Sequence, residues 1–150
     1  EARGFTAEEF AFSHPGGALG RQLLLRVSDV MVSGNEIPKV SASAVLIDAL
    51  YEMTAKGLGM TTVVNEHNHL VGVFTDGDLR RAVADQSDLQ NTSLISAMTI
   101  GAQTATEEML AAEAMSMMER HKISALVIVN EHGAVQGVVT LLALLKAGIS

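Results

Sequence analysis

The hydrophobic residues of this chain recur first at helical spacing and then in short continuous runs, and this order of patterns occurs twice. Over residues 41–59 the apolar positions follow the i, i+3, i+4, i+7 spacing of a helix with one buried face, and they are Leu46, Ala49, Leu50 and Met53. The sequence predicts Ser43 as the N-cap of this helix, and Gly57 and Gly59 suit its C-terminal stop.

Two β-branched segments follow this helix, and they predict strands over 61–66 and 69–75 joined by a tight polar turn. A second helix is predicted over 76–85. A short extended piece over 36–40 precedes the first helix, because its proline suits the start of a strand. The first half of the chain is therefore expected to follow the plan β–α–β–β–α.

The second half repeats this order at an offset of 65 positions, since VNEH begins at Val64 and again at Val129. Thr104 and Glu107 have the spacing of a capping box before the second long helix. The buried stripe of that helix is predicted at Ala111, Ala114, Met115 and Met118. Strands over 124–131 and 134–140 and a helix over 141–148 are predicted to follow it. Such a period indicates a duplicated unit whose copies bury their open faces against each other. We predict an α/β (α+β) fold of two β–α–β–β–α repeats packed as one module.

The composition narrows the class of protein. Hydrophobic residues make up 48% of the chain and are mostly aliphatic, with one Tyr, four Phe and no Trp, which is ample for a core. The absence of cysteine excludes a disulfide scaffold and fits a reducing compartment, so a cytoplasmic location is expected. The net charge of −7 argues against a nucleic-acid polymer as a partner. No apolar run approaches the ~20 residues that a membrane span needs.

The position best suited to chemistry is the Thr-Asp-Gly-Asp sequence of residues 75–78, between a strand and a helix N-terminus. The free N–H groups and the helix dipole favour a phosphate there, and the Thr75 hydroxyl adds a donor. The Asp78 carboxylate can accept hydrogen bonds from two ribose hydroxyls. The alternative is that Asp78 only caps the helix while Thr75 closes a turn. The second copy keeps Thr140 but has Ala143 in place of the carboxylate, so one functional cleft or two unequal ones are expected.

Other polar groups have simpler interpretations. Arg80 and Arg81 can reach a ligand phosphate, but a solvated charged helix face is the favoured interpretation. The two carboxylates of residues 75–78 lack a third ligand, so no metal site is predicted. His67 and His69 look like a ligand pair beside a glutamate. Because the same VNEH sequence recurs in the second copy, we expect them to be exposed hairpin-turn residues.

The tandem β–α–β–β–α plan, with Gly-Val-Phe-Thr and Gly-Val-Val-Thr closing the third strands, resembles the CBS domain named after cystathionine β-synthase. The resemblance covers residues 27–150 and implies that Thr75 and Asp78 form the Ser/Thr-x-x-Asp motif that contacts a nucleotide. It implies no required cofactor but a regulatory nucleotide or CMP-linked sugar. The base would lie near Ile37, Val40, Met60 and Thr61, and Thr140 would belong to a weak second cleft.

The N-terminal segment belongs to neither repeat. It contains Ser-His-Pro-Gly-Gly around His14, followed by Ala-Leu-Gly-Arg and LLLRVSDVM. Together with a CBS pair containing FTDGDLRR, this segment resembles the sugar-isomerase (SIS) plus CBS proteins of the arabinose-5-phosphate isomerase family, the KpsF/KdsD/GutQ group, and most of all KpsF/KdsD. The resemblance implies an upstream SIS domain that interconverts D-ribulose 5-phosphate and D-arabinose 5-phosphate for Kdo, lipopolysaccharide or capsule. It also implies that His14 is catalytic in the full-length parent, since imidazole suits proton transfer near neutral pH.

The expected organisation is a SIS-domain tail over 1–22, a first CBS domain over 23–84, and a linker with a second CBS domain over 85–150. Because the chain starts at Glu1 without methionine, we expect a C-terminal fragment that does not turn over substrate alone. One functional hypothesis is a ligand-sensing regulatory module. A second is a structural module that self-associates as a dimer or tetramer around vestigial clefts. A third, an enzyme confined to this fragment, is disfavoured because no second catalytic group lies near His14.

Overall fold

The computed structural model describes residues 24–149, so His14 and the rest of the expected SIS-domain tail lie outside the described residues. By their internal contacts the residues form two compact units. Of the described residues, one unit comprises 32–104 and 127–138, and the other comprises 24–31, 105–126 and 139–149. The predicted β–α–β–β–α order is present in both halves of the chain, which confirms the fold class.

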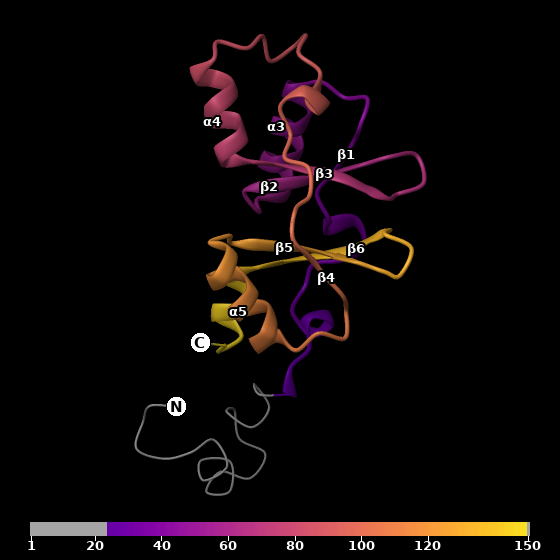
Figure 1. Cartoon of the computed structure of the whole chain (residues 1–150), viewed down its shortest axis with the longest axis vertical. Coiled ribbons are helices and arrows are strands. Elements are labelled where there is room, and N and C mark those ends of the chain that lie inside the picture. Colours follow the sequence, from indigo (N-terminus) through magenta and orange to yellow (C-terminus); the bar gives the residue numbers. More distant parts are fainter. Residues whose placement is uncertain (1–23, 150) are drawn as a thin grey trace, which may run out of the picture. The chain divides into compact units, whose positions relative to one another are not determined.

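The first repeat contains one sheet and two helices. After the 3-10 turns η1 (Val27–Asp29) and η2 (Gly34–Glu36), its elements are β1 (Lys39–Ser41), α3 (Leu46–Lys56), β2 (Met60–Val64), β3 (Leu70–Thr75) and α4 (Asp76–Ala84). Strand β2 is central, parallel to β1 and antiparallel to β3. Both helices lie on one side of this sheet (Figure 1).

The core of the first repeat lies between that face of the sheet and the two helices. Its buried side chains are Leu46, Ala49 and Met53 of α3, Val63 of β2, Phe74 of β3, Ala82 of α4 and Leu94 of the 3-10 turn η3 (Leu94–Ser96). The predicted stripe of α3 is confirmed, with Leu50 only half-buried. Each large aliphatic or aromatic side chain buried in this way contributes about 1.5–3 kcal/mol.

The two ends of α3 differ in how well the sequence predicted them. Ser43 is not the N-cap, because the helix starts after Val45 and the Asp48 carboxylate accepts a hydrogen bond from the Val45 N–H at 3.2 Å. The Ser43 hydroxyl instead lies 2.9 Å from that of Ser41. At the other end Gly57 has the left-handed φ of 72° that the predicted glycine stop requires.

The second repeat has the same plan. Its elements are β4 (Thr104–Ala105), α5 (Ala111–His121), β5 (Ala125–Val129), β6 (Val135–Thr140) and α6 (Leu141–Lys146), and the strand order is β4-β5-β6. All four residues of the predicted stripe on α5 are buried. The predicted capping box of Thr104 and Glu107 is wrong, because Thr104 belongs to β4. The Glu113 carboxylate accepts the hydrogen bond from the Leu110 N–H at 3.2 Å instead.

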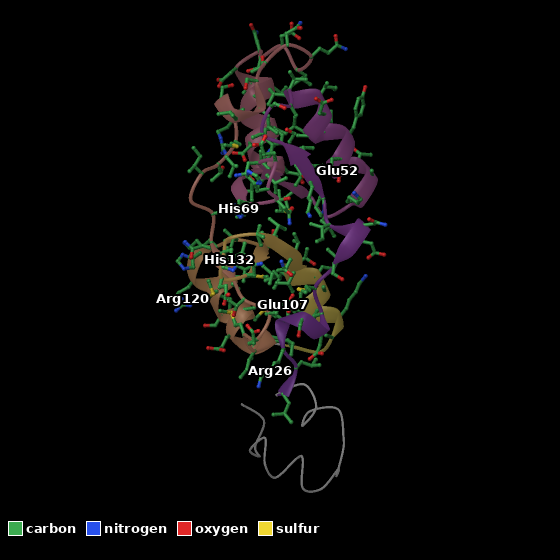
Figure 2. The ribbon with its side chains drawn as sticks, turned by 90° about the vertical axis from the view of Figure 1, so that its right-hand side faces the viewer. Arg26, Glu52, His69, Glu107, Arg120 and His132 are labelled. Atoms are coloured by element: carbon green, nitrogen blue, oxygen red, sulfur yellow. The ribbon has the colours of Figure 1, made fainter. Side chains whose placement is uncertain are left out.

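The VNEH turns have the same internal geometry in both repeats. The Asn65 side chain accepts hydrogen bonds from the N–H groups of His67 and His69 at 2.9 and 3.0 Å, and the equivalent Asn130 accepts one from the His132 N–H at 2.8 Å. His67 is exposed, as predicted. His69 (labelled in Figure 2) is half-buried, which corrects the prediction, because its backbone bridges to Ala134 of the second turn.

Glu52 (Figure 2) joins α3 to β1. Its carboxylate accepts hydrogen bonds from the Lys39 N–H at 2.9 Å and from the Lys56 ammonium at 2.6 Å. Partial burial raises the pKa of Glu52, but the hydrogen bonds from Lys56 and Lys39 and the Lys56 charge outweigh it, so the pKa lies below its ordinary value. The unfolded chain therefore binds the proton more tightly than the folded chain does. The stabilisation is complete above the unfolded pKa and is lost as the pH falls through the folded pKa.

We predict that Glu52→Gln lowers the free energy of unfolding at pH 7 by about 0.5–1.5 kcal/mol, the net worth of a hydrogen bond. It should also flatten the loss of stability of the wild type below the ordinary glutamate pKa of 4.5. Urea unfolding at neutral and acid pH measures both effects. Glu119→Gln, at an exposed position of α5, is the control and should keep the wild-type pH dependence. An unchanged acid slope in Glu52→Gln would contradict the assignment.

Candidate functional site

The candidate site lies where β3 ends and α4 begins. Thr75 is the N-cap of α4 and has an extended backbone. Its hydroxyl accepts a hydrogen bond from the Asp78 N–H at 3.2 Å, and the Asp78 carboxylate accepts one from the Thr75 N–H at 3.0 Å. This reciprocal pair is a capping box, which starts the helix where the strand stops. The Thr-x-x-Asp sequence therefore has a structural role before any ligand is considered.

The Asp78 carboxylate is almost completely buried, with only 3% of the residue exposed. Besides the Thr75 N–H, it accepts hydrogen bonds from the guanidinium of Arg81 and from the hydroxyl of Thr99. The Thr99 Oγ1 lies 3.0 Å from one carboxylate oxygen and 3.1 Å from the other. A buried charge requires partners of this kind, because losing water without replacement costs several kcal/mol.

Thr99 comes from the segment that leads into the second repeat, and sequence reasoning did not identify it. Its N–H and C=O form hydrogen bonds with the C=O and N–H of Val73 in β3, at 2.8 and 2.9 Å. A Cβ on Gly72 would lie 2.7 Å from the Thr99 carbonyl oxygen and 2.9 Å from the Met98 sulfur. The close approach of this segment to β3 therefore depends on a glycine at that position.

The duplication contains a signal that would have revealed this contact. Met98-Thr99 precedes the second repeat as Met31-Val32 precedes the first. Val32 forms an antiparallel bridge with Val138 of β6, and Thr99 forms the same kind of bridge with Val73 of β3. Each leading segment thus pairs with the last strand of the other repeat.

The residues predicted to line a base-binding surface lie along the β1–β2 pair. Ile37 and Met60 are each 5% exposed, Thr61 is fully buried and Val40 is half-buried. Met60 pairs directly with Thr75 across β2 and β3, so the structure brings these two predicted residues together. The Thr61 hydroxyl donates to the Thr62 carbonyl at 3.1 Å rather than remaining free.

A pocket of about 490 Å³ lies elsewhere on the same repeat. It is lined by residues 39–43 of β1 and the chain after it and by residues 64–67 of the first hairpin. These residues lie at the end of β2 opposite to Met60 and Thr75. Of the predicted base-binding residues only Val40 belongs to its lining, and neither Thr75 nor Asp78 does. The pocket is therefore separate from the junction of β3 and α4 at Thr75 and Asp78, the Thr75–Asp78 corner.

The second repeat has half of this arrangement. Thr140 is the N-cap of α6, and its hydroxyl accepts a hydrogen bond from the Ala143 N–H at 3.1 Å, as Thr75 does from Asp78. Ala143 has no carboxylate to accept a hydrogen bond from the Thr140 N–H. The two strand–helix junctions therefore differ in structure, because only the first has a carboxylate.

Among residues 24–149, no three or more His, Cys, Asp or Glu side chains gather into an arrangement that could hold a metal ion. In the same part of the chain, no helix combines the length and apolarity needed to cross a membrane.

Comparison with known proteins shows what the chain is similar to. The CBS domain family matches residues 27–85 and 93–150. The chain is 53% identical over 149 residues to the arabinose 5-phosphate isomerase KdsD of Pseudomonas aeruginosa, covering 99% of this chain and 46% of that protein. It is 48% identical over 150 residues to KdsD of Escherichia coli K12, covering 99% and 45%. The resemblance to these isomerases is confirmed, and the chain spans about half the length of the curated relatives it matches.

Solved structures with the same fold include CBS pairs bound to adenine compounds. The CBS domain pair of protein MJ0100, in complex with 5′-methylthioadenosine and S-adenosyl-L-methionine, superposes with a TM-score of 0.74 at 21% identity, covering 82% of this chain and 94% of that one. The CBS domain protein PAE2072 from Pyrobaculum aerophilum, complexed with AMP, superposes with a TM-score of 0.72 at 21% identity, covering 79% and 89%. At this identity the likeness confirms the fold.

We predict that Asp78→Ala lowers the free energy of unfolding by about 1–3 kcal/mol, because it leaves the part-buried Thr75 N–H without its acceptor and removes the contacts of the carboxylate with Arg81 and Thr99. Asp48→Ala is the matched control, since Asp48 is also the third residue of a capped helix but is exposed and accepts a single hydrogen bond. It should cost about 0.5–1 kcal/mol. Chemical unfolding of both variants measures the difference. Equal losses would show that burial and the Thr99 contact add nothing to the cap.

Proposed function

Because this chain belongs to the CBS domain family, we propose that it is the ligand-sensing regulatory module of an arabinose-5-phosphate isomerase. In this proposal it binds a nucleotide or a nucleotide-sugar at the Thr75–Asp78 corner of the first repeat. The parent enzyme would interconvert D-ribulose 5-phosphate and D-arabinose 5-phosphate for Kdo, and hence for lipopolysaccharide or capsule. The names of relatives at 48–53% identity support this assignment of the parent.

The observation that carries the ligand class is the coincidence of a carboxylate and a helix N-terminus in one repeat only. The N-terminus of α4, whose helix dipole favours a phosphate, lies beside Thr75. In its first turn the Asp76 N–H donates to the Gly59 carbonyl at 3.3 Å and the Asp78 N–H donates to the Thr75 hydroxyl at 3.2 Å, so a phosphate would compete with these two hydrogen bonds. Asp78 supplies the acceptor that two ribose hydroxyls require. CBS pairs bound to AMP or to S-adenosyl-L-methionine support a nucleotide at this fold. A CMP-linked sugar would suit a pathway that ends in Kdo.

Sensing requires more than binding. A ligand changes the activity of the parent enzyme only if it binds one conformational state more tightly than the other. The proposal therefore includes an upstream SIS domain in the same chain, with His14 at its active site. It also includes a cytoplasmic homo-oligomer, a dimer or tetramer, through which the change is transmitted.

A second candidate function, a structural self-association module, is favoured by a specific observation. Both oxygens of the Asp78 carboxylate already have hydrogen-bond donors from the protein itself. Across the described residues, no buried side-chain nitrogen or oxygen atom lacks a partner. Under this alternative the Thr-x-x-Asp sequence caps α4 and holds the segment around Thr99, and neither corner binds a ligand.

Calorimetric titration of the 150-residue chain with AMP, CMP, S-adenosyl-L-methionine and CMP-Kdo separates the two candidates. We predict saturable binding of one of these compounds and an added stability of about 2.7 kcal/mol at 100 times its Kd. Asp78→Ala should abolish this binding. Asp48→Ala, which also loses a capping carboxylate, should bind like the wild type.

The control separates the loss of a ligand contact from a general loss of stability. The titrations are made at a temperature at which circular dichroism shows every variant to be folded. Binding that survives in Asp78→Ala would place the ligand elsewhere. No binding of any compound to the wild type would favour the structural module.

A further inference from the structure

The contact between Thr99 and Asp78 is not needed to cap α4. The capping box between Thr75 and Asp78 is complete without it, since each of these residues already bonds the backbone of the other. Yet the Thr99 hydroxyl reaches both oxygens of the Asp78 carboxylate from 21 residues further along the chain. It is a hydroxyl donor to the same carboxylate that, under the proposed function, receives hydroxyl donors from a ribose.

The position of Thr99 is set by its backbone. The two hydrogen bonds to Val73 and the absence of a side chain on Gly72 hold residues 98–99 against β3. Thr99 is nevertheless exposed, whereas Asp78 is buried. Its hydroxyl can therefore turn to water at little cost when another donor reaches the carboxylate. Arg81 has a side chain that is 70% exposed and can also move aside.

The second repeat shows what replaces this contact where no carboxylate exists. The residue equivalent to Asp78 is Ala143, and Val32 pairs with the last strand of the second repeat as Thr99 pairs with that of the first. Val32 keeps the backbone pairing, with Val138, but has methyl groups in place of the hydroxyl. The hydroxyl is therefore present in the repeat that has an acceptor for it and absent from the repeat that has none.

We propose that Thr99 is an internal competitor for the ligand site, so that ligand binding to Asp78 and docking of residues 97–100 on the first repeat oppose each other. This inference rests on the proposed function. The ribose hydroxyls replace the Thr99 hydroxyl on the carboxylate, and the segment that leads into the second repeat loses its side-chain anchor. The ligand binds only those molecules in which the carboxylate is free of Thr99. Its apparent affinity therefore equals the intrinsic affinity multiplied by the fraction of such molecules. Because this segment continues into the second repeat, its release lets ligand binding in the first repeat affect the second.

The test compares AMP binding to the wild type, Thr99→Val and Thr99→Ser by calorimetric titration of the 150-residue chain. Valine is the residue that pairs with the last strand of the second repeat at the equivalent position, Val32, so the fold tolerates it. We expect Thr99→Val to bind AMP about three- to tenfold more tightly, the ratio that one net hydrogen bond confers. Thr99→Ser keeps the hydroxyl and should bind like the wild type. Thr54→Val, at an exposed position of α3, controls for the loss of a threonine hydroxyl elsewhere.

Amide hydrogen exchange supplies a readout that does not depend on affinity. The amide groups of residues 73 and 99 should exchange faster in Thr99→Val than in the wild type, and faster in the wild type once AMP is bound. Equal or weaker AMP binding by Thr99→Val, while the wild type binds, would overturn this inference and leave the proposed function intact. No AMP binding by either protein would overturn the proposed function for AMP and this inference with it.

Discussion

The hydrogen bonding of one buried carboxylate, that of Asp78, determines how the first repeat is assembled. It fixes the start of α4 through Thr75, pairs with Arg81 one turn along that helix, and anchors the inter-repeat segment through Thr99. A charge this deeply buried is tolerated because hydrogen-bond donors replace the water that it has lost. The strand, the helix and the segment that reaches the second repeat therefore depend on the same group. A ligand that binds this carboxylate would therefore affect the strand, the helix and the segment together.

The duplication explains why this group is informative. Two copies of one unit need the same core, and both copies keep the apolar stripe, the hairpin asparagine and the threonine N-cap. A carboxylate is not required for the fold, since Ala143 occupies its position and Thr140 still caps α6. The difference between the copies therefore separates what the fold needs from what the first repeat adds. What it adds is a charged acceptor and the hydroxyl that holds it.

Periodicity predicted most of the fold because apolar spacing is a direct record of which face is buried. The stripes of α3 and α5, the order of strands and the glycine stop at Gly57 were all predictable in this way. The helix starts were less so, because several polar residues compete locally for each cap. Ser43 contacts Ser41 while Asp48 binds the Val45 N–H.

The candidate site was predictable in its residues but not in its contacts. Thr75 and Asp78 are three positions apart, so their pairing follows from local spacing. The Thr99 contact depends on the path of the segment between the repeats and on Gly72, which local patterns do not encode. The most direct measurement is a crystal structure of the chain with AMP bound. We predict that the ribose hydroxyls lie on the Asp78 carboxylate and that the Thr99 hydroxyl lies beyond hydrogen-bond distance of it. AMP bound with the Thr99–Asp78 contact intact, or bound in the pocket of residues 39–43 and 64–67, would contradict it.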